Sequence, residues 1–262
     1  MEFFDAHAHY DDEKFKEDRQ LVIPAIYNAG ITKFVSAGYN LNSSVSGIKL
    51  ANEYNYIYTT VGISPNDLSE NWENDIDKIE ELLRNNNKDN DENSKIVAVG
   101  EIGLDYHYDT NPNWQKEAFI KQIKIANIFD LPIVIHTREA VMDTLEIIKL
   151  NEVKRKGIFH CCPFNRELVK EALKLGFYIS VAGPVTFKSS KNAEEIINMI
   201  PLDRILIETD SPYLSPEPVR GTRNDSRNIK YIAQKIAEFK NISLEDVAKS
   251  TYNNALKVYA IK

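Results

Sequence analysis

Residues 3–9 read FFDAHAH, and the run Phe3–His7 is the first of eight short apolar segments that decide the fold. Each segment is rich in apolar, β-branched or aromatic residues, and most are continuous rather than alternating. This pattern is typical of strands buried on both faces of a parallel sheet. The predicted strands are Phe3–His7, Lys33–Ala37, Ile57–Val61, Ile96–Gly100, Pro132–His136, Gly157–His160, Phe177–Val181 and Ile205–Glu208.

Helical patterns alternate with these strands. The first predicted helix, Asp12–Ala29, ends before Gly30, which suits a helix C-cap. Others are predicted to begin at Ser43 and Asp75 and to cover Asn113–Phe129, Glu139–Leu150, Arg166–Leu175, Asn192–Met199, Ile229–Glu238 and Ser243–Ala260. Strands alternating with helices indicate a parallel sheet, and eight repeats favour closure into an α/β TIM (β/α)8 barrel. We expect one domain over residues 1–262, with the polar stretch Asn85–Ser94 as a surface loop.

Composition narrows the class of protein. Apolar residues make up 43% of the 262 residues, which is ordinary for a globular protein, and the net charge is −7. An acidic total argues against a nucleic-acid binder, unless bound divalent cations and a local basic cluster offset it. We expect no membrane span, no secretory signal and no obligate protein partner. The adjacent Cys161 and Cys162 suit a reducing, cytoplasmic location.

Six residues that can bind a metal stand at the ends of predicted strands. In a barrel the carboxyl ends of the strands meet at one mouth, so these side chains would face one small volume. Singly, each residue is weak evidence for a metal site, because a histidine can pack in a core and an acidic residue can cap a helix. Together they favour a metal site, and imidazole with carboxylate suits Zn²⁺, Mn²⁺, Fe²⁺, Co²⁺ or Ni²⁺ better than Ca²⁺. The six are His7, His9, Glu101, His136, His160 and Asp210.

The motifs around these residues resemble those of the TatD family of deoxyribonucleases. The resemblance runs from residue 3 to the NNAL of Asn253–Leu256, nearly the whole chain. It implies a TIM barrel of the amidohydrolase-like metal hydrolases. The motifs are DAHAH (Asp5–His9), VGEIGLDYH (Val99–His107), IHTREA (Ile135–Ala140), FHC (Phe159–Cys161), GFYISVAGPVTFK (Gly176–Lys188) and LIETDSPYL (Leu206–Leu214).

The resemblance also implies an activity and roles for the six residues. It implies hydrolysis of DNA phosphodiester bonds, as a 3′–5′ exonuclease on single strands, with two divalent ions of Mg, Mn, Zn, Ni or Co. His7, His9 and Asp210 would hold one ion. His136 and His160 would hold the other, and Glu101 would bridge both. Glu101 would fix the spacing of the ions, and Asp210 would accept the proton of the attacking water.

Two loops depart from the family pattern. The family has G-x-H-P after strand three, where this chain has Ser64 in place of the histidine. That histidine would lie near the substrate, so its loss bears on rate or substrate preference rather than on metal binding. After His160 the family commonly reads C-F-S-G, whereas this chain has Cys161-Cys162-Pro163-Phe164-Asn165. We expect Cys161 to be a buried apolar thiol.

A substrate with repeated phosphates calls for cations at the mouth. We predict that Arg138, Lys188, Arg220 and Arg223 bind the substrate, with Arg227 and Lys230 adding to the local positive charge. Solvated surface cations are the competing interpretation. Three aromatic residues, Tyr106, Phe187 and Tyr213, are candidates for stacking on bases, or else ordinary core or rim residues. We expect His107 to be a surface-loop histidine.

Two other functions are open at this stage. One is a different hydrolase on the same barrel, either an amidohydrolase acting on a C–N bond or a deacylase of aminoacyl-tRNA, because one scaffold hosts many chemistries. The other is a non-catalytic binding protein that keeps the metal site, which Ser64 permits.

Overall fold

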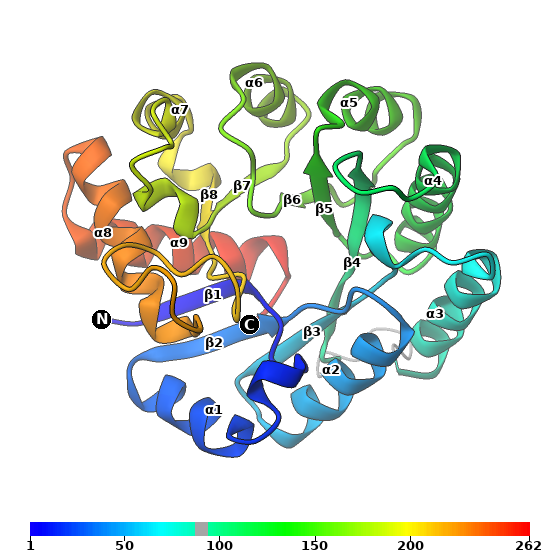
Figure 1. The fold of residues 1–262 in the computed structure, drawn as a ribbon, viewed down its shortest axis with the longest axis horizontal. Helices are drawn as coiled ribbons and strands as arrows, with labels where there is room; N and C mark the ends of the chain where they lie inside the picture. Colours follow the sequence, from blue (N-terminus) through cyan, green and yellow to red (C-terminus); the bar gives the residue numbers. More distant parts are fainter. Residues whose placement is uncertain (87–93) are drawn as a thin grey trace. The chain divides into compact units, whose positions relative to one another are not determined.

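The computed structural model describes residues 1–86 and 94–262. Within these ranges the chain alternates eight strands with helices (Figure 1), and the strands form one sheet in the order β1-β2-β3-β4-β5-β6-β7-β8. The pairs β3–β4, β4–β5, β5–β6 and β7–β8 are parallel, as predicted. The strands are β1 Phe3–Ala8, β2 Ile31–Ser36, β3 Ile57–Val61, β4 Ile96–Asp105, β5 Ile133–Arg138, β6 Gly157–Phe159, β7 Tyr178–Val181 and β8 Ile205–Ile207.

The helices follow the strands in turn. The chain consists of two compact units, one of residues 1–35 with 160–262 and one of residues 36–159. The α-helices are α1 Arg19–Asn28, α2 Leu41–Glu53, α3 Trp72–Asn86, α4 Pro112–Ile128, α5 Val141–Leu150, α6 Arg166–Lys174, α7 Ala193–Met199, α8 Ile229–Lys240 and α9 Leu244–Val258. Short 3₁₀ helices are η1 Glu13–Phe15, η2 Pro65–Asp67, η3 Gly183–Thr186, η4 Leu202–Arg204 and η5 Ser226–Asn228.

The first predicted helix was too long. Residues 13–15 form the 3₁₀ helix η1, and α1 begins only at Arg19. The Asp12 carboxylate accepts a hydrogen bond from the Lys14 amide and caps η1. The Arg19 guanidinium donates to the carbonyl oxygens of Tyr10, Asp11 and Asp12, and so fixes the chain in a non-helical path before α1.

Capping explains the other shifted helix starts. The N-cap of α2 is Asn40 rather than Ser43: Asn40 Oδ1 accepts from the Ser43 amide at 2.9 Å, and Ser43 Oγ accepts from the Asn40 amide at 2.8 Å. Helix α3 starts at Trp72, three residues before Asp75, because the Trp72 side chain is buried. It also continues through Asn86, so the predicted loop Asn85–Ser94 begins later, and its residues 87–93 lie outside the described ranges.

Strand β4 extends through Asp105 rather than ending at Gly100. Glu101 therefore lies inside the strand and not after it, at an irregularity in the β4–β5 register between Val99 and Ile102. Strand β6 is shorter than predicted and ends at Phe159, which leaves His160 just beyond it.

Two buried glutamines of α4 hold the loops after β3 and β4. Gln122 accepts from the Ile63 amide at 2.8 Å and donates to the Ile63 carbonyl at 3.0 Å. Gln115 makes the same pair of bonds with the backbone of Asp105, at 2.7 and 2.8 Å. The two lie seven residues apart, on one face of the helix. The polar backbone at the carboxyl ends of β3 and β4 is thus satisfied and fixed in place.

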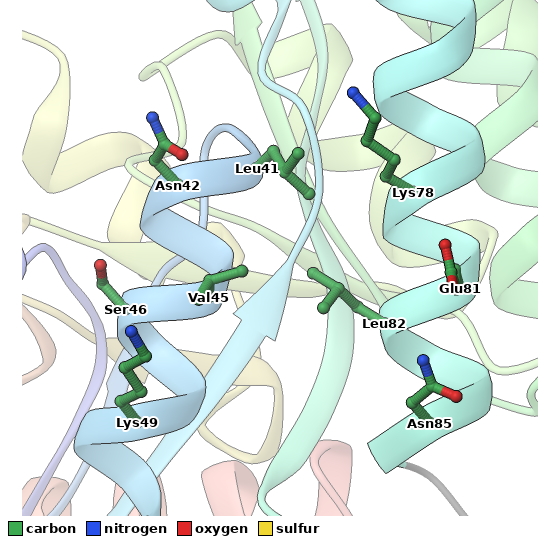
Figure 2. Close-up of a pocket in the computed structure, with 9 residues that line it drawn as sticks. All are labelled: Leu41, Asn42, Val45, Ser46, Lys49, Lys78, Glu81, Leu82 and Asn85. Carbon is green, nitrogen blue, oxygen red and sulfur yellow. The ribbon is translucent and has the colours of Figure 1, made fainter.

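A groove of about 570 Å³ lies between α2 and α3. Figure 2 shows Leu41 and Val45 of α2 facing Leu82 of α3, with Lys49 and Lys78 on either side. None of the candidate metal ligands lines this groove. None of the helices in the described part of the chain has the length and apolar character needed to span a bilayer.

Candidate metal centre

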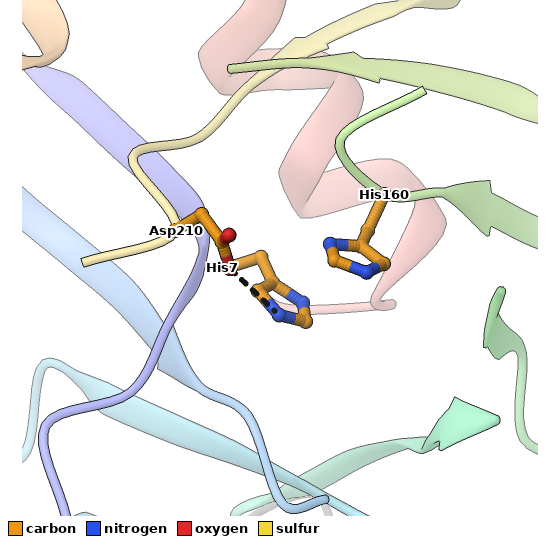
Figure 3. Close-up of side chains that lie close together, drawn as sticks. All are labelled: His7, His160 and Asp210. Carbon is orange, nitrogen blue, oxygen red and sulfur yellow. Dashed lines mark ion pairs between the residues drawn. The ribbon is translucent and has the colours of Figure 1, made fainter. Parts of the chain in front are cut away.

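Four of the six predicted ligands gather in the unit of residues 1–35 and 160–262. His7 lies near the carboxyl end of the buried strand β1, His9 follows that strand, Asp210 follows β8, and His160 follows β6. The His7 and His160 rings stack with their centroids 4.1 Å apart. Figure 3 shows these two rings beside the Asp210 carboxylate, and one donor atom from each of the three residues lies within 4.8 Å of the others.

The spacing of the donor atoms fits a bound cation. The Nε2 atoms of His7 and His9 are 3.2 Å apart, and Asp210 Oδ1 lies 3.2 Å from His9 Nε2 and 3.6 Å from His7 Nε2. Ligands about 2.1 Å from one ion at octahedral or tetrahedral angles are about 3.0–3.4 Å from each other. Two imidazole nitrogens facing each other also need a proton or a cation between their lone pairs. The donor set therefore suits a divalent metal.

The carboxyl of Asp210 is only 14% exposed. Burial raises its pKa, but the hydrogen bond from His9 and the nearby charges of His9, His7 and His160 outweigh burial and bring the pKa below its usual value. The Asp210 carboxyl is therefore anionic at neutral pH, the form that can bind a cation.

Glu208 orients His160, a role that the sequence analysis missed. Its carboxylate is fully buried, with Oε1 3.3 Å from His160 Nδ1 and 2.6 Å from the Cys161 amide that donates to it. Its Oε2 accepts a bond from the Ser180 hydroxyl. A carboxylate on one nitrogen of an imidazole fixes the ring and leaves the other nitrogen, here Nε2, available to bind a metal.

Asp5 is a second buried carboxylate that the sequence analysis did not assign. It accepts bonds from the Thr209 amide at 2.9 Å, the Thr209 hydroxyl at 2.5 Å and the Ser226 hydroxyl at 2.6 Å. Burial raises its pKa to about 7, even though the hydrogen bonds from Ser226 and Thr209 act to lower it. Asp5 thereby fastens β1, which carries His7, to the segment that carries Asp210.

The other two predicted ligands lie in the unit of residues 36–159. His136 Nδ1 is 3.1 Å from Glu101 Oε1, so the two groups form a second set of donors. His136 Nε2 lies 3.0 Å from Asp105 Oδ2. Asp105 thus stands on Nε2 of His136, whereas Glu208 stands on Nδ1 of His160.

Asp105 is in turn held by its own partners. Its carboxylate accepts bonds from the Asn66 amide group at 3.0 Å and from the His107 backbone at 2.9 Å. Burial alone would raise its pKa, but the bonds from His136, Asn66 and the His107 backbone lower it to about 2. One signal could have identified Asp105: it is an acidic residue that directly follows the run Ile102-Gly103-Leu104, and a buried carboxylate needs partners.

Ser64, which replaces the family histidine, is buried after β3. Its hydroxyl donates to Asp67 at 2.8 Å, and Asp67 also accepts from Asn40 at 2.9 Å. Ser64 therefore stabilises this loop. The same loop carries Asn66, whose side-chain amide donates to Asp105, the partner of His136.

The predicted substrate cations fall into two groups. Arg223 donates to both carboxylate oxygens of Asp18, at 2.8 and 2.6 Å, and its guanidinium lies over the Phe15 ring. Arg138, Lys188 and Arg220 are exposed. The guanidinium of Arg220 lies 4.1 Å from the centroid of Phe187. The role of all four in substrate binding stays a prediction.

The aromatic candidates also differ in exposure. Tyr213 is 44% exposed, with Lys14 over its ring and its own ring 6.4 Å from that of His9. Tyr106 is only partly exposed, and its hydroxyl donates to Asp143 at 2.7 Å. His107 is exposed, as expected of a loop histidine, and pairs with Glu139 at 2.8 Å. Cys161 is half-buried rather than buried.

Comparison with known proteins identifies the family. The model of the family described as TatD related DNase matches residues 4–260. The uncharacterized metal-dependent hydrolase YabD of Bacillus subtilis is 38% identical over 98% of this chain and 99% of its own length. The Escherichia coli hydrolase YcfH, similarly described, is 31% identical over 100% and 97%.

Solved structures agree on the fold. The structure of YjjV, a TatD homolog from Escherichia coli, has a TM-score of 0.91 to this chain at 23% identity, covering 99% of this chain and 98% of that one. This likeness confirms the predicted (β/α)8 barrel. Taken with the family model and the two full-length relatives, it leads to one conclusion: the chain belongs to the TatD family of metal-dependent hydrolases.

Proposed function

We propose that this protein hydrolyses phosphodiester bonds in single-stranded DNA, as a 3′–5′ exonuclease that uses two divalent ions. The observation that carries the proposal is the convergence of His7, His9 and Asp210 donor atoms at 3.2–3.6 Å, a spacing that suits a metal. The family description as TatD related DNase supports the substrate. Since neither cysteine is in a disulfide, we also propose a reducing, cytoplasmic location.

His7, His9 and Asp210 would hold one ion, and His136 and His160 the other, with Glu101 as the shared ligand. Two observations support this. All six residues lie in or just beyond the carboxyl-terminal parts of parallel strands that are ordered β1 to β8, and in barrels these parts form the active site. The two outer carboxylates, Glu208 and Asp105, orient His160 and His136 as expected for metal-ligating histidines.

When bound, divalent ions supply Lewis-acid chemistry, polarising the phosphoryl oxygens and lowering the pKa of water. The residues of the chain then have distinct tasks. Asp210 would accept the proton of the attacking water, and its low pKa suits it to start as the carboxylate. Arg138, Lys188 and Arg220 would pair with substrate phosphates, which offsets the net charge of −7.

The test of the proposed function is direct cleavage. Metal-stripped protein is reloaded with Mg²⁺, Mn²⁺, Co²⁺ or Zn²⁺ and mixed with a 5′-labelled single-stranded oligonucleotide, an aminoacyl-tRNA and a small amide. We expect a ladder of products that shorten from the 3′ end, while circular single-stranded DNA stays intact. An oligonucleotide that survives with all four metals refutes the proposal, and turnover of the amide or the charged tRNA would redirect it.

The ligand assignment is tested with Glu101→Ala. Because Glu101 is proposed as the shared ligand, this variant should lower the metal content and the activity together. Glu117→Ala, an exposed glutamate of α4, is the matched control and should keep both at the wild-type level. Wild-type metal stoichiometry in Glu101→Ala would remove Glu101 from the site.

A further inference from the structure

The segment that leaves β4 is fixed by polar contacts on every residue up to residue 107. The Asp105 carboxylate accepts from the His107 amide at 2.9 Å, and the Tyr106 amide donates to the Arg138 carbonyl at 3.0 Å. The Tyr106 hydroxyl donates to Asp143, and the His107 ring pairs with Glu139 at 2.8 Å. The backbone before Tyr108 is therefore anchored by hydrogen bonds up to residue 107.

The Tyr108 ring is 53% exposed. The guanidinium of Arg138 lies 5.4 Å from its centroid, and Arg138 Nη1 lies 3.5 Å from its hydroxyl. An exposed tyrosine side chain usually loses rotamer freedom when it binds a ligand. Here the fixed backbone and the stacked guanidinium restrict the ring beforehand.

Arg138 also connects Tyr108 to the donor set formed by His136 and Glu101. It follows His136 by two residues in β5, and side chains two apart in a strand point to the same face, about 6.6 Å from each other along the strand. A phosphate chain held at His136 would therefore pass within reach of the Arg138 guanidinium.

We propose that Tyr108 and Arg138 form a subsite that binds one unpaired nucleotide of the substrate, with its base stacked on Tyr108 and its phosphate paired with Arg138. This subsite rests on the proposed nuclease function and deepens it. Aromatic rings stack on any base, and a planar guanidinium pairs with a phosphate through two hydrogen bonds. The exposed carboxylates of Asp109, the next residue, and of Glu139, which pairs with His107, disfavour a second phosphate in this region, so stacking supplies most of the contact at Tyr108.

The experiment compares Tyr108→Ala with wild type on three substrates: octathymidylate, an abasic octamer with the same phosphates, and bis(p-nitrophenyl) phosphate. Loss of one stacked base should raise KM for octathymidylate about 5- to 150-fold. The abasic octamer should respond far less, because it has no base to stack, and turnover of the small diester reports whether the cleavage step itself is intact. Tyr108→Phe, which keeps the ring, should recover most of the affinity. Tyr27→Ala, a comparably exposed tyrosine in α1, is the control.

Binding measurements separate this proposal from the nuclease proposal. Fluorescence anisotropy with labelled octathymidylate and octauridylate in a chelator measures the subsite without catalysis. If wild type cleaves no oligonucleotide, the proposed function fails, yet weaker binding by Tyr108→Ala still supports the subsite. Equal Kd values for wild type and Tyr108→Ala overturn it, as does an equal rise in KM on the abasic octamer. Weaker binding of both oligomers by Tyr108→Ala is the expected result.

Discussion

Replacing Glu208 by glutamine tests whether this buried carboxylate supports metal binding through His160. Glutamine has the same shape and keeps an oxygen to accept from the Cys161 amide. Its amide group can donate to Ser180, whose hydroxyl can rotate to accept. The variant should therefore fold, while the hydrogen bond to His160 Nδ1 loses the negative charge that strengthens it.

The expected size follows from that contact. Changing an outer partner of a metal-ligating histidine costs about 10- to 100-fold in metal affinity, or about 1.4–2.7 kcal/mol. Glu208→Ala is a harsher change, because it leaves the buried Cys161 amide and Ser180 hydroxyl without this acceptor. At about 1–3 kcal/mol for each group, that variant should lose about 2–6 kcal/mol of folding stability.

The assay is calorimetric titration of the metal-stripped protein with Zn²⁺ and Co²⁺, next to thermal unfolding of the same samples. Glu167→Gln, an exposed glutamate of α6, controls for the loss of one carboxylate. We expect weaker binding in Glu208→Gln at an unchanged Tm. Unchanged affinity for both metals would refute the reasoning, since the contact between Glu208 and His160 would then have no effect on the ligand.

Three further predictions concern the scaffold and the substrate cations. Gly103→Ala should unfold the protein or cost at least about 3 kcal/mol by denaturant titration, because Gly103 has a φ of +140° and an added Cβ would lie 2.0 Å from the His136 carbonyl oxygen. Tyr259→Phe removes a buried bond to the Ala6 carbonyl and should cost about 1–3 kcal/mol at pH 7. Burial, with the charges of Glu208 and Asp5, raises the pKa of Tyr259 in the folded protein. The unfolded chain therefore loses the Tyr259 proton first, and the free energy of unfolding of wild type falls as the pH rises above the unfolded pKa of about 10. Tyr259→Phe has no such proton to lose, so its free energy of unfolding should fall less over that range. Arg220→Ala should raise KM for an oligonucleotide more than Arg223→Ala does. The main effect of Arg223→Ala should be a loss of about 1 kcal/mol or less of folding stability, because it removes the ion pair with Asp18. A larger KM in Arg223→Ala than in Arg220→Ala would contradict this.

The fold and the candidate ligands could be identified from the sequence because each depends on a local pattern. Continuous apolar runs identify strands buried on both faces, and the alternating His7 and His9 mark one side of an extended segment. Helix starts were less predictable, since Asn40 and Asp12 act as caps only through the geometry of the next residues. The register irregularity that places Glu101 inside β4 leaves no trace in the sequence.

The residues that orient the ligands were missed for a physical reason. Arg223 illustrates it for the surface: its partner Asp18 lies 205 positions away, so no local pattern indicates this ion pair. Asp105 and Glu208 illustrate it for the site. Each is a lone acidic residue at the end of a buried stretch, which indicates that it has a partner without indicating which one.

These two carboxylates face opposite nitrogens of their histidines. Glu208 stands at Nδ1 of His160 and leaves Nε2 available to bind a metal, whereas Asp105 stands at Nε2 of His136 and leaves Nδ1 facing Glu101. Nδ1 lies closer to the backbone than Nε2, so the two histidines would present a nitrogen at different distances from their strands. His136 lies inside β5 and His160 lies beyond β6, yet both can serve as ligands. The buried carboxylate behind each histidine occupies one ring nitrogen and leaves the other, at a different distance from the backbone, to bind a metal.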